Sequence, residues 1–152
     1  MDFEKKLAEL FIELPDIPKT LKGVVPAVSV GKQIYVGGLL PFWDGKVAFK
    51  GRLGIEISLD QGIMAARYAL INALSVVKEH CGSLNKVEKI VQLHSFLAVG
   101  GDFKDHERVV DGASSLLYDI FGGAGKHTRR IAGVMSLPQN ACLELALLVE
   151  VK

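Results

Sequence analysis

The chain has 152 residues, of which 49% are hydrophobic, and a formal net charge of +1 at pH 7. This length supports one well-buried core, so we expect a single domain over residues 1–152. The near-neutral charge, without a sustained run of Lys or Arg, disfavours a nucleic-acid partner, because phosphate backbones are bound by clustered basic side chains. The high apolar content favours an oligomer whose subunit faces bury further surface.

Cys81 and Cys142 are the only cysteines, and neither belongs to a closely spaced set of Cys and His, so the sequence supports neither a disulfide framework nor a metal site. Residues 1–14 alternate charged and apolar side chains, which is not the pattern of a signal peptide. No apolar stretch reaches membrane-spanning length without a charge. We therefore expect a cytoplasmic protein that does not enter a membrane.

Residues 2–11 have apolar side chains at helical spacing, which predicts a short amphipathic helix. Pro15 and Pro18 are expected to end it, because proline cannot continue a helix. We interpret residues 1–22 as an N-terminal extension of the domain.

Two β-rich segments, residues 24–30 and 33–38, flank Gly31-Lys32, and this pattern is typical of a tight hairpin. Residues 39–57 are rich in Gly and turn residues. We expect loops there, with one short strand at residues 47–50.

The first long helix is predicted to begin at a capping box, Ser58-Leu59-Asp60-Gln61. Apolar residues recur three or four apart to about His80, and Gly82 provides a stop. Residues 87–99 alternate and are rich in β-branched side chains, so a strand should follow.

A second helix is expected from Asp102 to Gly122-Gly123, weakened at Gly112, with an inward stripe of Val109, Val110, Ala113, Leu116, Leu117 and Ile120. Two strands close the chain, residues 129–136 and 142–151. This order predicts an α+β fold with a mixed sheet and both long helices on one face. Because the last strand is apolar on both sides, we expect a partner subunit to cover the other face of the sheet.

The segment from His127 to Pro138, followed by Leu143-Glu144-Leu145, resembles the C-terminal signature of the YjgF-like superfamily, also called Rid (reactive intermediate deaminase) or endoribonuclease L-PSP-like. That signature has an arginine, a strand, Leu-Pro and then a glutamate seven residues past the leucine. Arg129, Leu137 and Glu144 match it. The resemblance runs from about residue 24 to the C-terminus and points to a longer-chain branch.

The resemblance implies a chorismate-mutase-like fold (bacillus type) and a homotrimer with three intersubunit clefts. It also implies hydrolysis of amino-acid-derived imines or enamines, an activity of the 2-iminobutanoate/2-iminopropanoate deaminase type, without a cofactor. Arg129 would bind the carboxylate of a small metabolite, and Glu144 would be the catalytic residue that positions or activates water. Both roles suit the side chains, because guanidinium offers a planar pair of donors and a carboxylate can orient the attacking water.

The spacing of these two residues bears on where such a site can form. If the last two strands pair as a hairpin, Arg129 and Glu144 lie roughly 20 Å apart along the ladder, at about 3.3 Å per residue. That distance is too long for one ligand of a few carbons. We therefore expect a site with both residues to draw them from different subunits.

Three further residues are expected to contact the substrate: Gly37, Ile131 and Ser114. Many active relatives carry a serine at the position of Gly37, a cysteine at that of Ile131 and a tyrosine at that of Val24. The resulting loss of polar lining leaves an alternative open, a non-catalytic binding or regulatory module for small carboxylate metabolites.

Other residues near the signature have plainer interpretations. Arg130 should point away from Arg129 by strand alternation. His127 follows Gly-Ala-Gly-Lys; a general acid or base role is one interpretation, and a solvated loop histidine is the favoured one. Asp111 is a candidate to border the cleft. RNA cleavage or inhibition of translation is the least favoured function, because the sequence shows no patch that combines aromatic and basic side chains.

Overall fold

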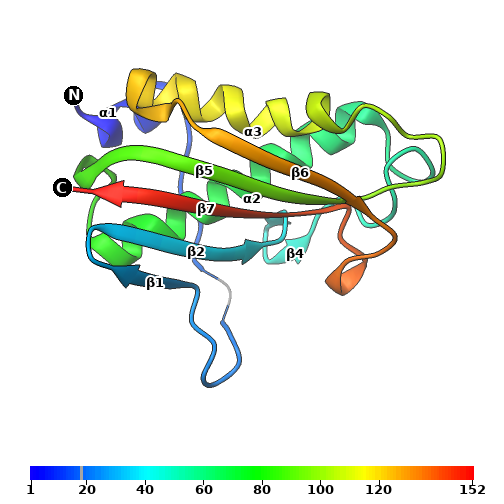
Figure 1. The fold of residues 1–152 in the computed structure, drawn as a ribbon, viewed down its shortest axis with the longest axis horizontal. Coiled ribbons are helices and arrows are strands. Elements are labelled where there is room, and N and C mark those ends of the chain that lie inside the picture. The colour runs from blue at the N-terminus through cyan, green and yellow to red at the C-terminus, as the bar shows by residue number, and fades with distance from the viewer. Residues whose placement is uncertain (18) are drawn as a thin grey trace.

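A computed structural model of the chain describes residues 1–17 and 19–152. Within these residues, five strands form one sheet in the spatial order β1-β2-β7-β5-β6 (Figure 1). The pair β5 and β6 is parallel and the other neighbours are antiparallel, so the expected mixed sheet is confirmed. The strands are β1 (Ala27–Val30), β2 (Gln33–Leu39), β5 (Val87–Ala98), β6 (Thr128–Val134) and β7 (Leu143–Val151).

The first two strands form the expected hairpin, in which Val30 pairs with Gln33 across Gly31-Lys32. Gly31 has a φ of 59°, a left-handed conformation that glycine adopts without steric cost. Strand β1 begins at Ala27, three residues later than the sequence pattern indicated.

Both long helices are crossover connections. Helix α2 (Leu59–Cys81) joins β2 to β5, and α3 (His106–Phe121) joins β5 to β6. Strands β2 and β5 run the same way, since both are antiparallel to β7, and β5 and β6 are parallel. Parallel strands need such crossovers, and both helices pack on the same face of the sheet (Figure 1).

Helix α2 has the ends that its sequence predicted. The Gln61 amide donates to Ser58 Oγ at 3.2 Å, and the Ser58 amide donates to Gln61 Oε1 at 2.9 Å, which completes the capping box. Gly82 ends the helix in the left-handed region at φ 94°. No helix in the described ranges 1–17 and 19–152 has the length and apolar character needed to cross a membrane.

Helix α3 begins at His106, four residues later than expected, because residues before it turn back and the Phe103 amide donates to the Gly100 carbonyl. Its inward stripe is buried as predicted. Gly112 lies where α3 meets α2, and a Cβ there would collide with the Ile63 carbonyl. The residue that weakens the helix in sequence terms therefore allows the two helices to approach closely.

The expected hairpin between the last two strands is wrong. Strand β6 pairs only with β5 among the described strands, and β7 is inserted between β2 and β5. Strand β7 is the most continuously apolar strand and takes a central position, whereas β6, with Arg129, Arg130 and Gly133, takes an edge. The connection between them contains a single 3-10 turn, η3 (Pro138–Asn140).

The two faces of the sheet differ in burial. Along β7, Leu143, Leu145, Leu147 and Val149 are buried against the helices, whereas the alternate residues are only partly buried. The loops after β2 contain a two-residue hairpin, β3 (Phe42–Trp43) and β4 (Lys46–Val47), in place of the single strand expected at residues 47–50. The remaining 3-10 turns are η1 (Leu84–Lys86) and η2 (Gly122–Gly125).

The N-terminal extension contains helix α1 (Phe3–Glu9), shorter than the expected range 2–11, and Phe3 and Leu7 pack into the core. The chain then turns at Phe11, which has a φ of 57°, so this helix ends before Pro15; the role expected for Pro18 lies outside the described residues. Polar contacts from distant sequence hold the helix in place. Asn85 Oδ1 accepts from the Phe3 amide at 2.7 Å, and Glu4 Oε1 accepts from the Leu84 amide at 3.0 Å.

The carboxylate of Glu4 makes the docking of α1 sensitive to acid. Burial raises its pKa, but hydrogen bonds from the Leu84 amide, Lys78 and Ser83 outweigh burial, and the pKa lies below its ordinary value of 4.5. A depressed folded pKa contributes stability that is fully present above the unfolded pKa and is lost as the pH falls through the folded pKa.

We therefore predict that Glu4→Gln lowers the free energy of unfolding near pH 6 but has little effect near pH 3. Urea unfolding at the two pH values measures this difference. Glu88→Gln, at an exposed position on β5, is the matched control and should change neither value. An equal loss for Glu4→Gln at both pH values would show that the charge of Glu4 is not what secures the helix.

Candidate functional site

Arg129 stands on β6 and points toward the helix face of the sheet. It is in register with Leu93, which is fully buried on that face. Its Nη1 donates to Asp111 Oδ1 at 2.7 Å and to Ser114 Oγ at 3.2 Å, both on α3. The Arg129 side chain is 23% exposed, whereas that of Asp111 is 59% exposed, so the guanidinium is partly buried and its carboxylate partner is more exposed to solvent.

His127 continues this set of contacts and is not simply solvated. Its Nε2 lies 2.9 Å from Ser114 Oγ, and its Nδ1 lies 2.7 Å from the Gly125 carbonyl oxygen. Turn η2 brings that carbonyl close because Gly125 lacks a Cβ, which would collide with the backbone of Leu117 on α3. The sequence interpretation missed this contact because it depends on the position of α3.

A cavity of about 340 Å³ opens beside these residues and is lined by Ser114, Tyr118, Gly125, Lys126, His127 and Arg129. Two of the five expected site residues, Arg129 and Ser114, therefore lie together. Ile131 lies two residues further along β6 and instead lines a separate cavity, together with residues 104–108 at the start of α3 and just before it. Gly37 lines a third cavity, whose lining from the N-terminal segment is Ile17, Lys19, Thr20, Val24, Val25 and Pro26.

Glu144 lies on the other face of the sheet. It pairs with Phe96 of β5 at a position that alternates with the buried residues Leu143 and Leu145 of β7. On its β2 side lies Gly38, where a Cβ would collide with the Glu144 carboxylate. Gly38 sits in an irregular stretch of β2, since the register with β7 shifts between Val36 and Leu39.

From the sequence, Gly37 is expected to be a site residue, but the glycine that lies beside the Glu144 carboxylate is Gly38. A Cβ on Gly37 would make only an ordinary contact, at 3.6 Å from the Pro26 carbonyl oxygen. The pair Gly37-Gly38 was visible in the sequence, but the bulge that decides which glycine faces Glu144 depends on the pairing of β2 with β7.

Arg129 and Glu144 of one chain therefore point away from each other. Leu93, which pairs with Arg129, and Phe96, which pairs with Glu144, are three residues apart on β5 and so face opposite sides of the sheet. The sequence-based expectation that Arg129 and Glu144 are far apart rested on a hairpin of the last two strands. That reasoning was wrong, because β6 and β7 do not pair with each other. Arg130 is in register with His94 and points to the Glu144 face, as strand alternation predicted.

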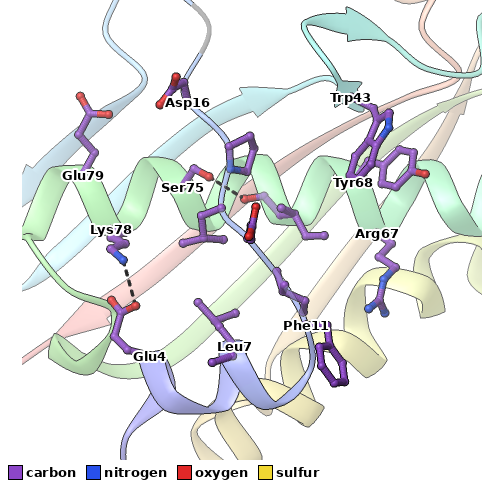
Figure 2. Close-up of a pocket in the computed structure, with 16 residues that line it drawn as sticks. Glu4, Leu7, Phe11, Asp16, Trp43, Arg67, Tyr68, Ser75, Lys78 and Glu79 are labelled. Carbon is purple, nitrogen blue, oxygen red and sulfur yellow. Dashed lines mark hydrogen bonds and ion pairs between the residues drawn. The ribbon is translucent and has the colours of Figure 1, made fainter.

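A larger groove, of about 1030 Å³, runs between the N-terminal segment and α2 and holds none of the expected site residues (Figure 2). Trp43 stacks on Tyr68 at one end of it, with ring centroids 4.6 Å apart. Its charged lining contains four carboxylates, from Glu4, Glu13, Asp16 and Glu79, and two cations, from Arg67 and Lys78. This excess of negative charge does not suit the phosphates of RNA.

The described residues contain no group of three or more His, Cys, Asp and Glu side chains placed to hold a metal ion. Burial raises the pKa of the Cys142 thiol to about 12, so this cysteine stays protonated near neutral pH and is a poor nucleophile.

The chain was compared with known proteins. A family model described as "YjgF/chorismate_mutase-like, putative endoribonuclease" matches residues 4–151. Protein TCP17 of Trypanosoma cruzi is 33% identical over 145 residues, covering 95% of this chain and 91% of that protein.

Two solved structures are also similar. A protein from Shewanella oneidensis with the same endoribonuclease description superposes with a TM-score of 0.96 at 33% identity, over 99% of this chain and 100% of that one. Escherichia coli TdcF, solved with bound serine, has a TM-score of 0.65 at 18% identity, covering 90% of this chain and 94% of that one, and this likeness concerns the fold alone. The chain therefore belongs to the YjgF/chorismate mutase-like family.

Proposed function

We propose that this protein hydrolyses imines or enamines derived from small amino acids, in clefts between the subunits of a homotrimer and without a cofactor. Arg129 of one subunit binds the carboxylate of the substrate, and Glu144 of a neighbour positions the water. The observation that carries the proposal is the placement of these two residues on opposite faces of one sheet. One subunit alone cannot bring both to one small ligand, whereas a second copy can.

The Arg129 half of the site suits a carboxylate. The guanidinium is held at the subunit edge, partly exposed, beside a cavity whose other charged lining residue is Lys126. Positive charge and a planar donor group are what a small anionic metabolite requires for oriented binding.

The Glu144 half suits hydrolysis at carbon. Water adds to the C=N carbon while Glu144 accepts one of its protons, and the nitrogen takes a proton as its π bond to carbon breaks. Collapse of the resulting carbinolamine expels ammonia and leaves a 2-oxo acid, so one water is consumed for each imine. The glycine at position 38 leaves room beside the carboxylate, because any side chain there would displace it.

The open face of the sheet is a natural surface for the neighbouring subunit. It carries the exposed apolar residues Val28, Val30 and Tyr35 and the partly buried Phe96 and Leu148. A contiguous apolar sheet face of this kind is typically covered in an assembly. Such a contact brings the β6 edge of one subunit toward the Glu144 face of the next.

The comparison with TdcF supports the class of ligand, since that protein was solved with serine, a small amino acid with a carboxylate. Gly37 and Ile131 contribute no side-chain donor or acceptor. This favours as second candidate a module that binds small 2-oxo acids without turnover, which uses the same Arg129 contact. The two functions are separated by whether ammonia is released.

For Arg129→Ala we predict at least a hundredfold loss in kcat/KM for freshly generated 2-iminobutanoate, because a charge-assisted bidentate contact contributes about 1.5–3 kcal/mol and also orients the reacting carbon. Release of ammonia in a coupled assay measures the rate. Arg67→Ala, in the groove between the N-terminal segment and α2 that holds none of the expected site residues, is the matched control and should retain most activity. If the unaltered protein releases ammonia no faster than the uncatalysed reaction, the deaminase function is excluded. Binding of 2-oxobutanoate, detected by calorimetry, would in that case support the binding module.

For Gly38→Ala we predict a large loss of kcat with retained folding, because the new methyl group displaces the flexible Glu144 side chain and leaves the backbone in place. Gly37→Ala has space for its methyl group and should stay near the unaltered rate. The pair is compared by ammonia release and by thermal unfolding. Equal activities for the two variants would mean that the position of Glu144 does not matter for turnover.

A further inference from the structure

With the His127 imidazole neutral, the hydrogen bonds around Arg129 have one consistent proton order. The Gly125 carbonyl can only accept, so His127 Nδ1 carries the hydrogen that it receives at 2.7 Å. In the neutral imidazole, Nε2 is then an acceptor, and the Ser114 hydroxyl donates to it at 2.9 Å. The Ser114 oxygen is left as an acceptor for Arg129 Nη1 at 3.2 Å.

In this proton order, the hydrogen bonds of Arg129 to Asp111 and Ser114 both come from Nη1 of the guanidinium. Nη1 has two hydrogens, and Asp111 and Ser114 take one each. Within residues 1–17 and 19–152, no hydrogen bond engages Nε or Nη2 of Arg129. These two nitrogens lie along one edge of the planar guanidinium, and such an edge binds a carboxylate with two parallel hydrogen bonds.

We infer that His127, acting through Ser114, is a positioning residue that fixes Nη1 of Arg129 inside the subunit and leaves its Nε–Nη2 edge for the ligand carboxylate. The inference rests on the proposed function for the identity of the ligand, but the proton order does not. The Gly125 carbonyl sets the histidine tautomer, the tautomer sets the serine hydroxyl, and the hydroxyl sets the rotation of the guanidinium. Neither His127 nor Ser114 needs to touch the reacting carbon.

The first experiment needs no ligand. Nitrogen-15 NMR of the four histidines of the unliganded protein reports which ring nitrogen carries the proton, and the His127 signals are assigned by their loss in His127→Asn. We expect the neutral Nδ1–H tautomer. The Nε2–H tautomer would overturn the inference whatever the protein does to imines.

The second experiment measures binding of 2-oxobutanoate, a stable 2-oxo acid, by calorimetry. Ser114→Ala and His127→Asn should each weaken binding roughly tenfold, which corresponds to 1.4 kcal/mol, and should raise KM more than they lower kcat. His127→Gln should recover part of the affinity, because its amide oxygen can accept from Ser114 where Nε2 did. Asparagine is too short to reach, so it separates positioning from simple filling of space.

The outcomes are distinct. Unchanged affinity in Ser114→Ala, with Arg129→Ala still abolishing binding, would show that Arg129 needs no positioning by His127 and would overturn the inference while sparing the proposed function. If the unaltered protein neither releases ammonia from the imine nor binds the 2-oxo acid, the proposed function fails. In that case two NMR measurements still decide whether His127 positions Arg129. The first is the tautomer of His127, and the second is the Arg129 Nε–H signal, which should shift in Ser114→Ala.

Discussion

The pairing of strand β5 with its two neighbours is the constraint on which the rest of this molecule depends. Parallel pairing with β6 puts Arg129 in register with a core leucine, so its side chain points toward the helices and meets α3. Antiparallel pairing with β7 puts Glu144 in register with Phe96, so its carboxylate points away from the helices. Because side chains alternate along a strand, moving either neighbour by one residue would exchange the faces and separate each residue from its present contacts.

Each half of the candidate site also relies on a glycine where backbone and side chain approach closely. Gly125 lets turn η2 lie against α3 and presents a carbonyl to His127, and Gly38 leaves room for the Glu144 carboxylate between β2 and β5. These positions explain why a site with few polar side chains still has defined geometry. Arg129 is oriented by the side chains of Asp111 and Ser114 on α3, and Ser114 in turn contacts His127, which lies against the Gly125 carbonyl.

Much of the fold followed from local patterns in the sequence. The capping box at Ser58, the stop at Gly82 and the buried stripe of α3 are local signals, and the structure has all three. The pairing of the last strands was not predictable in this way, because their joining segment does not show that β7 lies beside β2 and β5. The expected site residues Arg129 and Ser114 lie together, whereas the contacts of His127 and Gly38 join distant segments and are encoded by no local pattern.

The most direct test of a site shared between subunits is complementation between two inactive variants, Arg129→Ala and Glu144→Gln. If each cleft takes Arg129 from one subunit and Glu144 from another, random co-refolding of an equal mixture should restore roughly a quarter of the clefts, and with them about that fraction of the unaltered activity. Each variant refolded alone should stay inactive. Ammonia release by the co-refolded mixture at the level of the separate variants, together with gel filtration showing that mixed oligomers formed, would contradict the account.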